Sequence, residues 1–75
     1  MKDPKIIIDS DVAQISARYA EQYNTSATEA MRLFLGSKTY EALVNVETGL
    51  CFEMTSAIYE LFLDEVGEND DGKNN

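Results

Sequence analysis

One stretch of this chain, residues 26–63, carries most of the material from which a small domain can build a core. It contains most of the aromatic residues, the single cysteine, two helix-start signals and a turn marked by glycine. No catalytic or ligand-binding pattern is recognisable within it. We therefore expect the apolar side chains of this segment to form the core and its other side chains to form a surface for contact. The sequence thus bears on what the protein binds and not on a reaction that it catalyses.

The length of the chain, 75 residues, allows one domain with a small core. A domain of this size buries only about 60% of the surface that its unfolded chain exposes, so a disulfide, a metal or a second chain commonly completes it. Cys51 is the single cysteine, and the sequence has no histidine. Because a disulfide needs a second thiol and soft metal ligands are scarce, association with a second copy or with another protein is the expected route.

The formal net charge is −8, from 14 acidic and 6 basic residues. Nucleic-acid affinity rests largely on lysine and arginine side chains that neutralise phosphates, so this balance argues against a general DNA or RNA binder. It is compatible with simple solubility and also with attraction to a basic protein surface. No run of about 18 apolar residues indicates a membrane span, and no secretory signal is recognisable. Together with a free cysteine, this predicts a cytoplasmic protein.

Three consecutive β-branched residues, Ile6 to Ile8, lie near the start of the chain and favour an extended strand. A helix that begins with Asp3 as N-cap and Pro4 in its first turn is the alternative, and it stays open at this point. A helix over about residues 10–23 is predicted next, because apolar residues recur there at spacings of three and four.

A capping box at Ser26-Ala27-Thr28-Glu29 predicts the start of a second helix. After Gly36-Ser37 the apolar residues no longer fall on the same face of this helix, which predicts a break and a third helix over residues 38–45. Glu47-Thr48-Gly49 is a turn signal. A last helix capped by Thr55 or Ser56 is predicted to run through Val66 and to end at Gly67.

The segment between the turn and the last helix alternates in polarity, which predicts a short strand. The fold class is therefore mainly α: a small bundle of three to four helices, with or without a two-stranded β element formed by Ile6–Ile8 and Leu50–Met54. We predict one helical domain over residues 1–66. Residues 67–75 are rich in Asp and Asn, and we expect them to form a disordered acidic tail.

Enzyme chemistry finds little support in the sequence. Without histidine, the commonest general base near neutral pH is missing. Cys51 lies between Leu50 and Phe52, which is typical of an inert, partly buried thiol. The last residues of a phosphate-binding loop are similar to Gly36-Ser37-Lys38-Thr39. The upstream glycine and the preceding strand of such a loop are missing here. We therefore predict a protein that is not an enzyme, with no cofactor and no metal.

The predicted order of strand, helix, asparagine turn and capped helix over residues 5–35 is similar to that of the ribbon-helix-helix repressors. That resemblance implies a dimer whose paired strands place alternate residues in the DNA major groove, which here would be Lys5, Ile7 and Asp9. These three make a poor reading surface, because aspartate repels phosphate and isoleucine can contact only a thymine methyl group. A dimeric DNA-binding regulator is therefore the alternative function.

Four patterns in the second half are similar to those of a group of short, uncharacterised bacterial helical proteins. They are Ser26-x-x-Glu29-Ala30, Ser37-Lys38-Thr39-Tyr40, Glu47-Thr48-Gly49-Leu50 and Tyr59-Glu60-Leu61-Phe62. Some members of such families are encoded in small operons beside toxin-like genes. The resemblance implies an accessory or antitoxin-like protein with a basic, toxin-like partner, and it transfers no catalytic residue.

We therefore predict a non-catalytic protein–protein interaction module. Exposed aromatic side chains near the third and last helices would supply rigid apolar contact, and neighbouring carboxylates would steer a basic partner. The alternative is that these aromatic side chains all belong to the core. The predicted partner-binding residues are Tyr40, Glu41, Glu47, Phe52, Glu53, Tyr59, Glu60 and Phe62.

Overall fold

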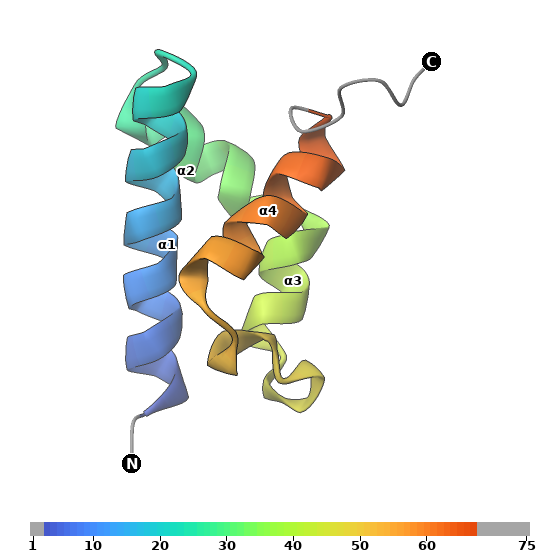
Figure 1. Cartoon of the computed structure of the whole chain (residues 1–75). Helices are drawn as coiled ribbons and strands as arrows, with labels where there is room; N and C mark the ends of the chain where they lie inside the picture. The colour runs from blue at the N-terminus through green and yellow to red at the C-terminus, as the bar shows by residue number, and fades with distance from the viewer. Residues whose placement is uncertain (1–2, 68–75) are drawn as a thin grey trace.

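The computed structural model describes residues 3–67, and within them the chain forms α-helices and short 3-10 helices but no strand. In Figure 1 the long first helix stands beside the last one, and the two 3-10 helices lie at the end where the first helix begins. The mainly helical bundle is therefore confirmed, and the two-stranded element is not. The elements are α1 (Pro4–Gln22), α2 (Ala27–Leu35), α3 (Lys38–Val44), η1 (Val46–Thr48), η2 (Leu50–Phe52) and α4 (Thr55–Val66).

The first helix begins at Pro4, so the strand predicted for Ile6–Ile8 is wrong. A side-chain oxygen of Asp3 accepts a hydrogen bond from the backbone N–H of Lys5 at 3.0 Å, and Pro4 occupies the first turn. As a helix, this segment packs Ile7 and Ile8 against the core. The alternative helix start is the one that forms, because a capped start combined with burial outweighs the modest strand preference of β-branched residues.

The strand predicted for Leu50–Met54 is also wrong, because this segment turns instead of extending. Gly49 has a left-handed backbone with φ of +75°. The backbone N–H groups of Phe52 and Glu53 then donate to the carbonyl groups of Gly49 and Leu50, at 3.0 Å each. With Ile6–Ile8 in a helix there is no strand beside which this segment could pair. Its backbone groups are satisfied locally in η2 instead.

The local signals for the second and third helices are confirmed. The Ser26 hydroxyl oxygen accepts a hydrogen bond from the N–H of Glu29 at 3.0 Å, at the start of α2. The Ser37 hydroxyl oxygen accepts one from the N–H of Tyr40 at 3.1 Å, at the start of α3. Each cap satisfies an N–H group that the first turn of a helix leaves without an internal partner. The break at Gly36-Ser37 therefore separates two short, independently capped helices.

Carboxylates from neighbouring helices lie at the start of α3 and of α4. At α4, the cap predicted for Thr55 does not form: Met54 is the N-cap, and the Thr55 hydroxyl donates to Asp11 of α1 at 2.7 Å. At α3, Glu65 accepts hydrogen bonds from the N–H groups of Lys38 and Thr39, at 2.7 and 2.9 Å. Negative charge is favourable near a helix N-terminus. These contacts fix α4 to α1 at one end and to α3 at the other.

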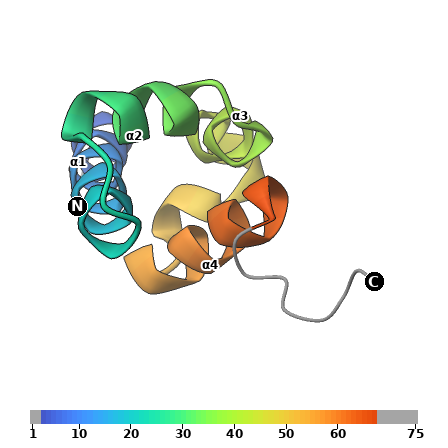
Figure 2. The same cartoon turned by 90° about the horizontal axis from the view of Figure 1, so that it is seen from above.

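The core lies where the four helices face one another, and Figure 2 shows them around a common centre. A series of aromatic rings crosses it. The ring centroids of Tyr19 and Phe62 are 5.5 Å apart, those of Phe62 and Phe34 are 5.0 Å apart, and those of Phe34 and Tyr40 are 5.8 Å apart. The last two pairs meet edge to face, which is a favourable geometry for aromatic rings. The series connects α1, α4, α2 and α3, so each helix contributes to one shared core.

Candidate functional site

The side chains that the sequence predicted to bind a partner separate into exposed and buried groups. Tyr40 is half-buried against Phe34, and two of the predicted aromatic residues are fully inside. Phe52 is 61% exposed, so it alone among the predicted aromatic residues offers a large contact area. The exposed group consists of Glu41, Glu47, Phe52, Glu53 and Glu60.

The expectation that Tyr59 and Phe62 are exposed is wrong. Tyr59 is 3% exposed, and its hydroxyl donates to the side-chain oxygen of Gln22 at 2.7 Å. The guanidinium carbon of Arg18 lies 5.0 Å from the centroid of the Tyr59 ring. Phe62 is 0% exposed and lies in the aromatic series of the core. A small domain needs this apolar area to fold, so these residues are structural.

The three most exposed large apolar side chains in the described part lie at one end of the molecule. Met54 is 73% exposed, Ile6 is 64% exposed and Phe52 is 61% exposed. Ile6 belongs to the first turns of α1, and Phe52 and Met54 belong to η2 and the residues after it, which lie at the same end in Figure 1. We call Ile6, Phe52 and Met54 the apolar end. Exposed apolar side chains that gather in one region can mark a binding surface, and these three are the most exposed of those in the described part.

Acidic residues accompany the apolar end. Glu53 lies between Phe52 and Met54 in the chain, and Asp3 lines the same hollow as Ile6. The carboxylate of Asp9 forms an ion pair with the amine of Lys5 at 3.5 Å, on an exposed face of α1. An exposed pair of this kind contributes little to stability. The surroundings are therefore negative, which suits a basic partner.

Ile6, Met54 and Asp11 are not among the partner-binding residues predicted from the sequence. A signal for Ile6 and Asp11 exists once the first segment is treated as a helix. Asp11 is then three residues after Ile8 and four before Ile15, on the buried face, while Ile6 falls on the opposite side. For Met54 there is no local signal, because its exposure follows from the turn that replaces the strand.

Beside the apolar end, a hollow of about 660 Å³ lies between the first half of α1 and the start of α4. Asp11 is 4% exposed and forms part of its wall. One carboxylate oxygen of Asp11, Oδ1, accepts the Thr55 hydrogen bond, whereas Oδ2 is buried and has no hydrogen-bond partner. Buried polar atoms nearly always have such a partner, so this atom is unusual. The lining residues are Asp3, Ile6, Ile7, Ser10, Asp11, Gln14 and Thr55.

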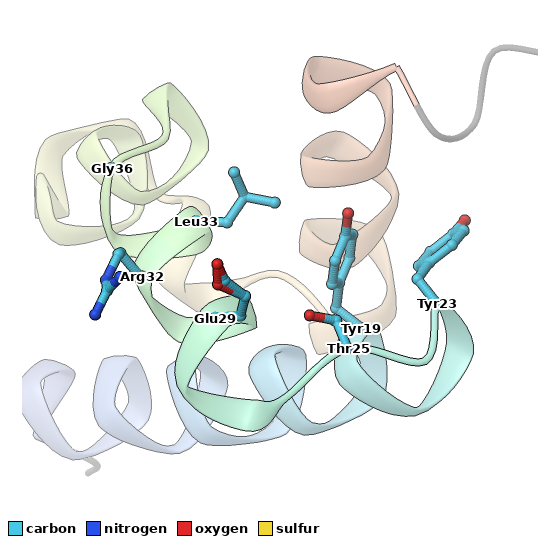
Figure 3. A pocket seen from close by; sticks show the side chains of 7 residues that line it. All are labelled: Tyr19, Tyr23, Thr25, Glu29, Arg32, Leu33 and Gly36. Atoms are coloured by element: carbon cyan, nitrogen blue, oxygen red, sulfur yellow. The ribbon is translucent and has the colours of Figure 1, made fainter.

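A second hollow, of about 650 Å³, lies between the end of α1 and α2. Figure 3 shows Leu33 and Tyr19 pointing into the space between α2 and α4, while Arg32 points away from it. Its charged groups therefore do not converge on one point, as they do in most ligand sites. The lining residues are Tyr19, Tyr23, Thr25, Glu29, Arg32, Leu33 and Gly36.

The residues that the ribbon-helix-helix resemblance assigns to DNA lie on α1. Lys5 and Asp9 are one helical turn apart and pair with each other, and Ile7 packs partly against the core. A strand would have presented all three side chains on one face, whereas the helix separates Ile7 from the other two. The strand surface that the DNA-binding alternative requires is therefore absent from residues 3–67.

Within residues 3–67 there is no cluster of three or more potential acidic, histidine or cysteine metal ligands. None of the helices in this part of the chain has the length and apolar character needed to cross a membrane. Cys51 is 1% exposed, so its predicted burial is confirmed. Comparisons of the chain with protein-family models, with curated proteins and with solved structures found no match.

Proposed function

We propose that this protein is a non-catalytic interaction module that binds a basic protein through its apolar end. The observation that carries the proposal is the exposure of Ile6, Phe52 and Met54 at one end of a domain whose other aromatic side chains are largely internal. A chain this small gains from burying every large apolar side chain, so the side chains that remain exposed together are free to contact a partner.

The charge of the chain supports a basic partner over a second copy of the same chain. The net charge is −8, and Asp3 and Glu53 accompany the apolar end. Two copies that met through this end would bring like charges together, which costs free energy. A basic surface would instead be attracted before contact, and the attraction would raise the association rate.

An antitoxin-like or accessory role in a small bacterial operon is the biological setting that we propose, with a basic, toxin-like protein as partner. The resemblance of residues 26–62 to short bacterial operon proteins supports this setting. A cytoplasmic location, supported by the free thiol of Cys51, fits the same setting. In this proposal the partner contacts η2 and the first turns of α1, because Tyr59 and Phe62 on α4 are buried.

A peptide-display screen against the immobilised full-length protein tests the proposal. Selected peptides should contain lysine or arginine beside apolar residues. They should lose binding when Phe52→Ala and Met54→Ala are combined. The matched control combines Leu33→Ala and Leu35→Ala, two α2 side chains that are each 43% exposed, and it should retain binding. Circular dichroism of each variant verifies that the helical fold is kept.

The proposal is contradicted if no peptide family is enriched, if the enriched peptides lack basic residues, or if the Phe52 and Met54 substitutions leave binding unchanged. Loss of binding in the α2 control alone would also contradict it, and would move the site to the hollow beside Tyr19 and Leu33.

A further inference from the structure

The carboxylate of Asp11 has an unusual environment. It is 4% exposed, and its two oxygens differ: Oδ1 accepts the hydroxyl hydrogen of Thr55 at 2.7 Å, while Oδ2 has no donor. Leaving a buried polar atom without its hydrogen bond costs about 1–3 kcal/mol, and more when the group is charged. A ligand that brings a donor to Oδ2 would recover this free energy.

Within residues 3–67, the two basic residues nearest to Asp11 in the sequence are already engaged elsewhere. Lys5 pairs with Asp9 on the exposed side of α1, and the guanidinium of Arg18 lies over the ring of Tyr59. Asp11 therefore lacks a cationic partner within residues 3–67. Buried carboxylates are usually paired, so a cation from another molecule is the natural complement of this one.

We infer that Asp11 receives a lysine side chain of the partner that binds the apolar end. This inference rests on the proposed function and names the specific contact within it. The hollow that Asp11 lines has about 660 Å³, which is ample for one long side chain. Ile6 belongs both to the lining of the hollow and to the apolar end, so a partner that covers the apolar end would lie next to the hollow.

The lining of the hollow matches the two parts of a lysine side chain. Ile6 and Ile7 form its apolar wall, along which a methylene stem can pack. Asp11, Asp3 and Gln14 supply oxygen atoms near its polar wall, and an ammonium group can donate three hydrogen bonds. Lysine therefore fits both the apolar and the acidic character of this hollow.

Lysine suits this site better than arginine. The advantage of arginine is a planar fork that bonds both oxygens of one carboxylate. Here Oδ1 is already bonded to Thr55, so a single free oxygen remains. An ammonium group donates from a single point and needs no second oxygen on the same carboxylate.

Access to Oδ2 requires side chains around it to move, because this atom has almost no exposed surface. Ser10 and Gln14, one turn apart on α1, are exposed and line the same hollow. The amide of Gln14 donates to the hydroxyl oxygen of Ser10 at 2.9 Å. This contact is on the exposed side of α1 and contributes little free energy, so it adds little resistance to a movement of these two side chains.

The test is an NMR titration of the full-length, ¹⁵N-labelled protein with N-acetyl-lysine methylamide. The neutral isostere, N-acetyl-norleucine methylamide, and the arginine analogue are titrated in parallel. The lysine probe should shift the amide signals of residues 10–14 and of Thr55 in a saturable manner. The norleucine probe should not, and the arginine probe should bind more weakly.

Asp11→Asn is the decisive variant, because asparagine keeps the shape of the side chain and an oxygen for the Thr55 hydroxyl. Affinity for the lysine probe should fall by roughly tenfold to a hundredfold, the range expected for a hydrogen bond to a charged group. Asp9→Asn removes an exposed charge from the same helix and should change the affinity little. Unchanged binding in Asp11→Asn, equal loss in Asp9→Asn, or equal binding of the norleucine probe each overturn the inference.

Failure of this inference is distinguishable from failure of the proposed function. Peptides from the display screen that need Phe52 and Met54 but bind Asp11→Asn normally would preserve the function and reject the lysine contact. Lysine-probe shifts that vanish in Asp11→Asn, obtained together with a failed screen, would preserve the Asp11 site and reject the function.

Discussion

Glu65, in the last turn of α4, holds the start of α3 through Thr39. Its Oε1 atom accepts hydrogen bonds from both the backbone N–H and the hydroxyl of Thr39, at 2.9 and 2.7 Å, and its Oε2 atom accepts one from the N–H of Lys38 at 2.7 Å. A helix as short as α3 has little stability of its own, so this contact from another helix is a large part of what fixes it.

Replacing Glu65 should therefore cost stability. Glu65→Gln keeps one oxygen but removes the charge and one acceptor, and we expect the free energy of unfolding to fall by about 1 kcal/mol, as for loss of a helix cap. Urea unfolding followed by circular dichroism measures this change. Glu41→Gln, an exposed position in the first turn of α3, is the control: it removes a negative charge from the same helix start without breaking these hydrogen bonds, and it should cost less. An equal loss in both variants would show that negative charge near the start of α3, and not the hydrogen bonds of Glu65, is responsible.

The contribution of Glu65 should depend on pH. Burial raises the pKa of its carboxyl group, but hydrogen bonds from Lys38 and Thr39 and the charge of Lys38 outweigh this and lower the pKa below its ordinary value of 4.5. Because the folded state holds the proton less tightly than the unfolded state, the stabilisation is complete above pH 4.5 and is lost as the pH falls through the folded pKa. The stability difference between the wild type and Glu65→Gln should shrink over that range. A difference that stays constant with pH would contradict the assignment.

Tyr59 should set a limit to stability at high pH. Burial is the main cause that raises the pKa of its hydroxyl above the ordinary value of 10.0, and Tyr23, Tyr19 and Glu60 add to it, whereas Arg18 opposes it. The folded state keeps its proton where the unfolded state loses it, so stability is complete below pH 10 and declines as the pH rises through the folded pKa.

Tyr59→Phe separates the two roles of this hydroxyl. Near neutral pH the variant should lose about 1 kcal/mol, because the hydrogen bond to Gln22 is gone. Above pH 10 its stability should decline less steeply than that of the wild type. Urea unfolding at a series of pH values measures both effects, and parallel curves at high pH would show that Tyr59 does not titrate with folding.

Local signals predicted the helix starts that depend on a single side chain. Ser26 and Ser37 each cap the helix that follows, because the hydroxyl and the N–H group it satisfies are only three residues apart. The strand predicted for Ile6–Ile8 was wrong although Asp3 and Pro4 offered a local helix start, because the burial of Ile7 and Ile8 against distant residues decided between the two. The strand predicted for Leu50–Met54 was wrong because a strand needs a pairing partner elsewhere in the chain. Local preference carries no information about such contacts.

The same limit explains the candidate site. Leu61 is 47% exposed and its neighbour Phe62 is 0% exposed, and the apolar composition of α4 gives no means to decide which of them faces inward. The contacts of Thr55 with Asp11 and of Glu65 with Thr39 fix the rotation of α4. Both join residues far apart in the chain. The exposure of Phe52 was predicted by the same reasoning that wrongly exposed Tyr59 and Phe62, whereas the contributions of Ile6 and Met54 required the fold.

Two phenylalanine residues provide a direct test of which aromatic side chains hold the core. Phe62→Ala should reduce the free energy of unfolding by about 3–5 kcal/mol, because it empties the centre of the aromatic series. Phe52→Ala should change it by no more than about 0.5 kcal/mol, since this ring is 61% exposed. Thermal and urea unfolding compare the two. A large loss in Phe52→Ala would mean that this ring is structural, and it could then no longer serve as a partner-binding residue.

Gly49 and Gly36 form a matched pair for the turn that shapes the apolar end. Gly49 has φ of +75°, and an added Cβ would meet no atom within 4 Å, so Gly49→Ala should cost about 1 kcal/mol from backbone strain alone. Gly36 has φ of −91°, and its Cβ would contact the Arg32 carbonyl oxygen at an ordinary 3.6 Å. Gly36→Ala should therefore be neutral or stabilise by up to about 1 kcal/mol, because alanine restricts the unfolded chain.

Urea unfolding distinguishes the two glycine substitutions, and NMR should show that Gly49→Ala shifts the signals of Phe52 and Met54. If both substitutions had the same effect, the left-handed conformation at Gly49 would not be what positions η2 and the residues after it.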